Sequence, residues 1–161
     1  MQKYIETPRL ILRDWKEEDI PFFARMNADP NVMEFFLSSL SIVESSRRDL
    51  SFITLASSYM GYTGLHQITF DVDFAPGIEI GWRLAHEYWG QGYAPEAATA
   101  CLEYTRNKTD IKELFSFTSL LNQRSERVMQ KIGMERIREF DHPLVPGEHP
   151  LCRHVLYHIK F

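Results

Sequence analysis

Several features that would assign a chain to a specialised class are scarce or missing in this sequence. It has only two cysteines, Cys101 and Cys152, and they form no CxxC pair, so we expect reduced, buried thiols. No stretch approaches the roughly 18 to 20 apolar residues of a membrane-spanning helix. No basic segment followed by an apolar run opens the chain. We therefore expect a cytoplasmic protein.

An excess of positive charge is missing as well. Lys and Arg number 18 against 22 for Asp and Glu, which gives a net charge of -4. Nothing in this balance draws the whole protein onto a nucleic acid or an anionic membrane, so we expect neither as a partner. Repeats, low-complexity tracts and linkers are absent too, and 161 residues with 44% hydrophobic content suit one domain over residues 1–161.

The first half of the chain predicts alternating strands and helices. Phe22, Phe23 and Met26 recur at helical spacing in a helix that opens at 19–21 and is broken at 29–30. Residues 32–52 predict a loop followed by a helix, and 52–56 fit either a compressed strand or the end of that helix. The predicted strands are 9–13, 62–70 and 78–84, of which the last two should form a hairpin.

The second half continues the mixed pattern. Residues 91–106 predict an amphipathic helix that follows a glycine turn. Asn122 is expected to cap a second helix, which ends at Gly133. The predicted strands are 114–118, 136–140 and 151–159, and a proline-rich turn over 141–150 joins the last two.

The most informative stretch runs from Trp82 to Ala94, where a strand leads through Gly90 and Gly92 into a helix. Such a loop can turn its backbone N–H groups toward a phosphate, and the helix N-terminus adds partial positive charge. The alternative, that the glycines only make a tight turn, stays open. A kinase-type loop would need Gly-Lys-Ser/Thr, and a dinucleotide site would need a third glycine or an alanine where Pro95 stands. Both classes are therefore disfavoured.

Two segments carry a family resemblance. Residues 89–97 read Trp-Gly-Gln-Gly-Tyr-Ala-Pro-Glu-Ala, and 122–134 read Asn-Gln-Arg-Ser-Glu-Arg-Val-Met-Gln-Lys-Ile-Gly-Met. The first resembles the pyrophosphate-binding loop of the GNAT (Gcn5-related N-acetyltransferase) superfamily, and the second resembles that family's Asn-x-x-Ser signature. With Thr-Pro-Arg-Leu-Ile-Leu-Arg at 7–13, the resemblance covers nearly the whole chain and points to the RimJ/RimL-type branch.

The resemblance implies an α+β fold and a cofactor site. The expected architecture is a twisted, mostly antiparallel mixed sheet, flanked by about four helices and splayed between the strands that end near Leu84 and Thr118. Acetyl-CoA would enter this opening as co-substrate, without a metal. Its pantetheine would lie along one strand and its pyrophosphate on the glycine loop. The residues implied for binding it are Ile80, Trp82, Arg83, Leu84, Gly90, Gln91, Gly92, Tyr93, Ala94 and Asn122.

Two departures from the family pattern stand out. Glu87 occupies the first position of the loop motif, where the family often has Arg or Gln, and it places an acidic group near the phosphates unless it points to solvent. The region 38–59 is shorter than the second helix and following strand of the family. We therefore expect this chain to differ on its acceptor side.

Acetyl transfer to an amine needs a base, because amines are protonated at neutral pH. Strand alternation places Glu79, Gly81 and Arg83 on one face, and Glu79 is our candidate base, acting directly or through a water. Its alternative role is a solvent-facing or Arg-paired strand residue. The resemblance implies that Ser125 protonates the departing thiolate, although it could equally serve the helix terminus.

The function predicted is therefore acetyl transfer from acetyl-CoA to a primary amine, by direct attack of the amine on the thioester. The acceptor is a protein N-terminus or a small-molecule amine, and Tyr62 and His66, which alternate on one face of a strand, could line its cleft. A non-catalytic acyl-CoA-binding module is the alternative. The protein is expected to be a monomer or a homodimer.

Overall fold

A computed structural model describes residues 3–37, 51–55 and 59–161 of the chain. The described α-helices are α1 (Ile20–Ala28), α3 (Tyr93–Lys108) and α4 (Gln123–Lys131), with 3-10 turns η1 (Glu17–Asp19) and η2 (His86–Tyr88). The strands are β1 (Lys3–Glu6), β2 (Ile11–Arg13), β3 (Ser51–Leu55), β4 (Tyr59–Gln67), β5 (Ile78–Leu84), β6 (Glu113–Ser119), β7 (Glu135–Asp141) and β8 (Arg153–Lys160).

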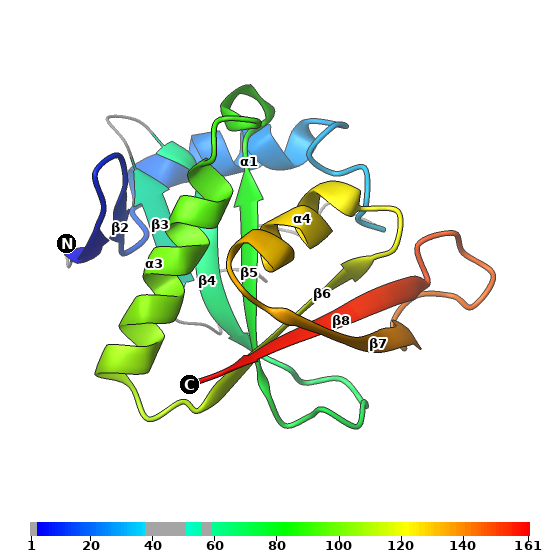
Figure 1. The fold of residues 1–161 in the computed structure, drawn as a ribbon. Helices are drawn as coiled ribbons and strands as arrows, with labels where there is room; N and C mark the ends of the chain where they lie inside the picture. The colour runs from blue at the N-terminus through cyan, green and yellow to red at the C-terminus, as the bar shows by residue number, and fades with distance from the viewer. Residues whose placement is uncertain (1–2, 38–50, 56–58) are drawn as a thin grey trace.

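All eight described strands join one mixed sheet in the order β1-β2-β3-β4-β5-β6-β8-β7. Its neighbours pair antiparallel except β5 and β6, which run parallel and share a single registered pair, Glu79 with Phe115. By contrast, β4 and β5 pair continuously from Gly61–Leu84 to Gln67–Ile78. Strands β5 and β6 therefore diverge beyond Glu79, as Figure 1 shows, and the predicted splay is confirmed.

The helices cover the sheet on two sides. Helices α3 and α4 pack on one face, where Ile80, Ala98, Leu114 and Met129 are at most 1% exposed. Helix α1 packs on the other face, where Phe23 and Met26 join Tyr59 and Ala85 in a second cluster. Burial of these side chains supplies the main stabilisation of the layered arrangement.

Most predicted elements are found. Of the two alternatives left open for 52–56, the structure shows the strand, β3, and it adds β1, which was not predicted. Phe22 is 40% exposed whereas Phe23 is 3% exposed; the Phe22 ring lies at the rim of the second cluster, with its centroid 6.1 Å from that of Tyr59. The helix expected within 32–52, the fourth of the predicted set, lies mainly outside the described residues.

Cys101 and Cys152 are both free and buried, as expected. Burial raises the pKa of the Cys101 thiol to about 12, so this thiol stays protonated at neutral pH. No described helix is both long and apolar enough to cross a membrane.

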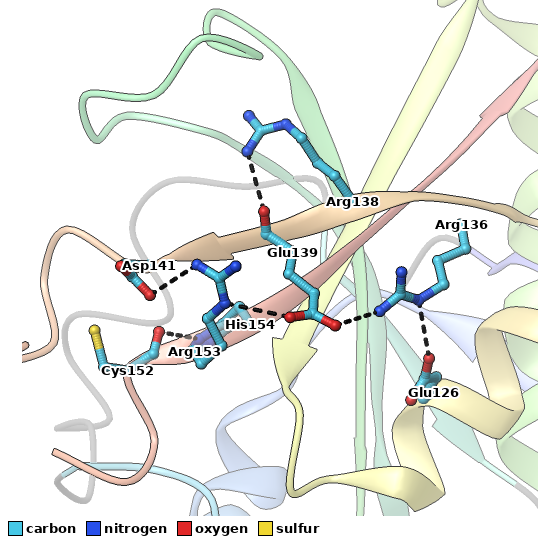
Figure 2. Close-up of polar contacts among 8 residues, drawn as sticks. All are labelled: Glu126, Arg136, Arg138, Glu139, Asp141, Cys152, Arg153 and His154. Atoms are coloured by element: carbon cyan, nitrogen blue, oxygen red, sulfur yellow. Dashed lines mark hydrogen bonds and ion pairs between the residues drawn. The ribbon is translucent and has the colours of Figure 1, made fainter.

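A chain of ion pairs runs along strands β7 and β8 at the edge of the sheet (Figure 2). Arg136 contacts Glu126 at 3.8 Å and Glu139 at 2.8 Å. Glu139 also accepts from Arg153 at 3.3 Å, and Arg153 in turn contacts Asp141 at 3.2 Å. These groups are largely exposed, so each pair adds little to stability on its own.

An aromatic cluster lies beside this edge. The loop between β4 and β5 carries Phe70, whose ring centroid lies 4.6 Å from that of His142, and Phe117 of β6 lies 5.8 Å from the same imidazole. His154 is 4.9 Å away. Burial, and secondarily the neighbouring His154, lower the pKa of His142 from its ordinary 6.5 to about 4. The imidazole is thus neutral in the folded protein at physiological pH.

This depressed pKa predicts a loss of stability in acid. The unfolded chain binds the His142 proton below pH 6.5 and the folded chain only near pH 4, so stability falls as the pH drops through this interval. Because the ring is half-buried, we expect about 1 to 2 kcal/mol from it. Urea unfolding at pH 7 and pH 5 should show a smaller difference for His142→Phe than for wild type, and His149→Gln should behave as wild type. An unchanged difference in His142→Phe would contradict this assignment.

Candidate active site

The loop between β5 and α3 holds the two glycines in conformations that other residues rarely adopt. Gly90 and Gly92 have φ values of 74° and 80°, and Gly92 is the N-cap of α3. The N–H groups of Tyr93 and Ala94, in the first turn of that helix, have no helical acceptor, and Pro95 has no N–H to leave unpaired. A row of backbone donors at a helix N-terminus is a site suited to an anion such as pyrophosphate.

The N-terminal segment clamps this loop to α3. Arg9 donates from Nε to Glu96 at 2.6 Å and from Nη1 to the Gln91 carbonyl at 3.0 Å. Its guanidinium lies 4.5 Å from the centroid of the Tyr93 ring. The Thr7 hydroxyl donates to the same carboxylate at 2.6 Å. Burial acts to raise the pKa of Glu96, but the hydrogen bonds from Thr7 and Arg9 outweigh it and lower the pKa.

Sequence reasoning missed this clamp. It noted Thr7 and Arg9 as part of a family motif, yet their partner lies almost ninety positions later in the chain. A glutamate in the first turn of a helix that follows a glycine loop was the one available signal, because acidic groups are favoured there.

Glu87 turns away from the row of free N–H groups. Its carboxylate is 3.8 Å from Arg25 of α1 and half exposed, while its main-chain carbonyl accepts from the Gln91 side chain at 3.0 Å. The acidic group at the first motif position therefore pairs with α1, and the loop keeps its backbone donors for an anion.

The opening between β5 and β6 presents main-chain groups of β5. At its narrow end, the Ser116 hydroxyl donates to the Ile80 carbonyl at 3.0 Å. At its wide end, Trp89 Nε1 donates to the Leu84 carbonyl at 2.9 Å. Main-chain groups along a strand point alternately to its two neighbours, so the N–H and C=O of Trp82 point to the β6 side, as the carbonyls of Ile80 and Leu84 do. Trp82 lies beyond the last registered pair with β6. Of the predicted strand residues, Trp82 is thus the one whose backbone is placed to pair with an extended ligand.

The opposite wall of the opening is the start of α4. The Asn122 side chain accepts from the Ser125 N–H at 3.2 Å and donates to the Ser125 hydroxyl at 3.2 Å, so both residues form the helix cap. Arg124 reaches back across the opening, pairing with Glu34 at 2.8 Å and lying 4.5 Å from the Trp89 ring centroid. This bridge was not predicted from the sequence.

A row of polar side chains occupies the α1 side of β4 and β5. Glu79 and His66 are registered partners across the two strands. A Cβ placed on Gly81 would lie 3.9 Å from Glu79 Oε1 and 3.7 Å from His66 Cδ2, so the carboxylate and the imidazole flank a bare stretch of strand. Tyr62 packs edge-on against His66 at 6.3 Å. The structure thus brings together Glu79 and the two residues predicted to line an acceptor cleft.

Arg83 continues the same row. Its side chain donates to Asn27 of α1 at 2.8 Å, and its guanidinium lies 4.0 Å from the Phe36 ring centroid. Burial raises the pKa of the neighbouring Tyr62, and the Arg83 charge acts against this shift. The sequence named Arg83 as a cofactor contact on this strand, and its side chain lies with Asn27 and Tyr62 on the α1 side.

Comparisons with known proteins agree with this geometry. A family model described as an acetyltransferase (GNAT) domain matches residues 9–135. The chain is 28% identical to YkkB of Bacillus subtilis over 88% of its own length and 92% of that protein. A GNAT-family acetyltransferase from Bacillus anthracis superposes with a TM-score of 0.79 at 23% identity, covering 97% of each chain. The spermidine N-acetyltransferase of Vibrio cholerae, solved with CoA and spermine, gives 0.75 at 16% identity over 96% of each chain.

The clamp predicts a pH-dependent contribution from Glu96. Because the pKa of Glu96 is lowered by folding, its stabilisation is present above the ordinary value of 4.5 and is lost as the pH falls through the folded value. Glu96→Gln should cost about 0.5 to 1 kcal/mol at pH 7, and progressively less as the pH is lowered from 4.5 through the folded pKa. Urea unfolding measures both, with the exposed Glu103→Gln on the same helix as control. A variant as stable as wild type at pH 7 would show that the clamp contributes nothing.

Proposed function

The chain belongs to the GNAT acetyltransferase family, and from that premise we propose that it transfers the acetyl group of acetyl-CoA to a primary amine. Acetyl transfer from acetyl-CoA is the chemistry of the family. Our proposal adds that the group acetylated is a primary amine. One observation supports it most directly. The same strand, β5, carries the free backbone beside the glycine loop at Trp82 and the carboxylate of Glu79 next to bare Gly81.

The residues present fit the cofactor. The backbone donors of 90–94 would hold its pyrophosphate, and the main chain of Trp82 would pair with its pantetheine as an added strand does. Gly90 has open space where a side chain would stand, so the loop can approach the phosphates closely. When bound, acetyl-CoA supplies the thioester that is attacked.

Glu79 is the proposed base. It accepts a proton from the incoming ammonium group, directly or through a water, and so frees the nitrogen lone pair. The nitrogen then forms its bond to the thioester carbonyl carbon and loses its second proton to water. The C–S bond breaks, and the electron pair of that bond stays on sulfur. Gly81 makes this possible sterically, because any side chain there would stand between the Glu79 carboxylate and the His66 ring.

Ser125 is the proposed donor of a proton to the departing thiolate. It lies at the first turn of α4, on the wall opposite β5, with its hydroxyl held by Asn122. The hydroxyl accepts in that hydrogen bond, so its own proton remains available for sulfur, and water returns a proton to the hydroxyl as sulfur is protonated. The helix-cap role of the residue uses its backbone N–H, and the two roles are compatible.

The acceptor is a small-molecule amine or a protein N-terminus. The Vibrio cholerae relative was solved with spermine, which shows that the fold accommodates a small amine. The motif at 7–13 supports a place in the RimJ/RimL-type branch, whose members act on N-termini. A non-catalytic acyl-CoA-binding module is the second candidate, and its sole support is the short region 38–59, which lies largely outside the described residues.

Replacing Glu79 separates catalysis from cofactor binding. Glu79→Gln should bind acetyl-CoA as wild type does, yet release thiol about 10²- to 10⁴-fold more slowly at pH 7. The loss should shrink at pH 10, where the amine is deprotonated without help. Calorimetric titration and a thiol assay with N-terminal peptides, polyamines, aminoglycosides and amino acids measure both effects.

Glu113→Gln on β6 is the matched control and should retain full turnover. Binding of acetyl-CoA with no thiol release on any amine, in wild type as well, would favour the binding module. Full turnover in Glu79→Gln would remove this residue from the mechanism while leaving the transferase intact.

Ser125→Ala distinguishes the acid from the helix cap. The variant keeps the backbone N–H that Asn122 caps, so its unfolding free energy should stay within about 0.5 kcal/mol of wild type. Turnover should fall about 10- to 100-fold, because sulfur then takes its proton from water. Unchanged turnover would leave Ser125 as a structural residue only.

A further inference from the structure

Among the described residues, two arginine side chains are buried, and only one of them has a carboxylate partner there. Arg13 is 3% exposed and forms a two-pronged pair with Asp19, at 2.8 Å and 2.7 Å. Arg83 is 6% exposed, and its one hydrogen bond within the described residues goes to the neutral side chain of Asn27, at 2.8 Å. A buried guanidinium without a counter-charge is costly, because its hydration is lost without compensation.

The surroundings of Arg83 leave donors without acceptors. Its Nε and the Nδ2 of Asn27 are both buried and have no hydrogen-bond partner within 3–37, 51–55 and 59–161. Aromatic rings flank the guanidinium, with centroids at 4.0 Å for Phe36 and 5.5 Å for Tyr62. Such rings attract a cation but offer no strong acceptor. The group is therefore rich in donors and positive charge, and no carboxylate of the described residues pairs with it.

The Arg83 guanidinium lies on the same side of the sheet as Glu79, the proposed base. Arg83 and Glu79 lie on the same face of β5, with bare Gly81 between them. Tyr62 touches both ends of the row, since its ring lies beside the Arg83 guanidinium and edge-on to His66. The part of β5 that lies between Glu79 and Arg83 on this face is therefore the glycine, which carries no side chain.

Resting on the proposed function, we propose that Arg83 and Asn27 bind a carboxylate of the acceptor, so that the substrate is an amino acid or a similar compound with both an amine and a carboxylate. The guanidinium supplies paired donors in the geometry that carboxylates accept, and the Asn27 amide adds one more. The site would reject a polyamine, whose second ammonium would meet a buried positive charge.

Matched acceptor pairs test this preference. Each common amino acid is compared with its own carboxamide as acceptor, with both rates corrected to the concentration of deprotonated amine. For at least one amino acid, wild type should show a kcat/KM about tenfold or more above that of the carboxamide. Arg83→Met keeps the apolar length of the side chain and removes its charge, and it should abolish the preference mainly through KM. The exposed Arg106→Met, on α3, should retain it.

A binding arm separates this proposal from the proposed function. N-acetylated amino acids and their carboxamides are titrated into wild type and Arg83→Met with CoA present, which requires no turnover. Tighter binding of a carboxylate form to wild type alone supports the carboxylate site even if no amine is acetylated, in which case only the transferase fails. Amine-dependent thiol release with no carboxylate preference in either arm overturns the Arg83 proposal and leaves the transferase standing. If Arg83→Met unfolds, the wild-type pairs still decide the question.

Discussion

The structure depends on the place where β5 leaves β6. The two strands share one registered pair, and the hydrogen bond from Ser116 to the Ile80 carbonyl closes the narrow end of the opening. Were the pairing continuous, the peptide groups of Trp82 would be used up within the sheet. Because parallel strands normally pair along their length, the gap leaves main-chain groups of β5 that an extended ligand would pair with under the proposed function.

The same strand then serves two partners. Its main chain faces the opening, next to a loop whose Gly90 and Gly92 conformations expose backbone donors. Its side chains alternate, so that Ile80 anchors the core under α3 while Glu79 and Arg83 face the α1 side. Cofactor and acceptor can therefore meet across a single strand. The packing of α3 supports this strand, and the clamp of Arg9 on Glu96 fixes the loop that follows it.

Local sequence signals predicted the parts of the site that local structure determines. The two glycines and Pro95 predicted the start of α3, and Asn122 predicted the cap of α4, because those roles need particular residue types at fixed offsets. Strand alternation placed Glu79 and Arg83 on one face for the same reason. The Arg9–Glu96 clamp, the Arg124 bridge to Trp89 and the Asn27 contact of Arg83 could not be predicted, because each joins segments far apart in sequence through tertiary packing.

A crystal structure of the protein with CoA tests the central claim most directly. We expect the pantetheine to occupy the opening between β5 and β6, paired with the Trp82 main chain, and the pyrophosphate to accept hydrogen bonds from the N–H groups of 90–94. The free thiol should then lie beside Gly81, within reach of both the Glu79 face and the start of α4. CoA bound elsewhere, or an opening filled by the protein's own side chains in the complex, would contradict it.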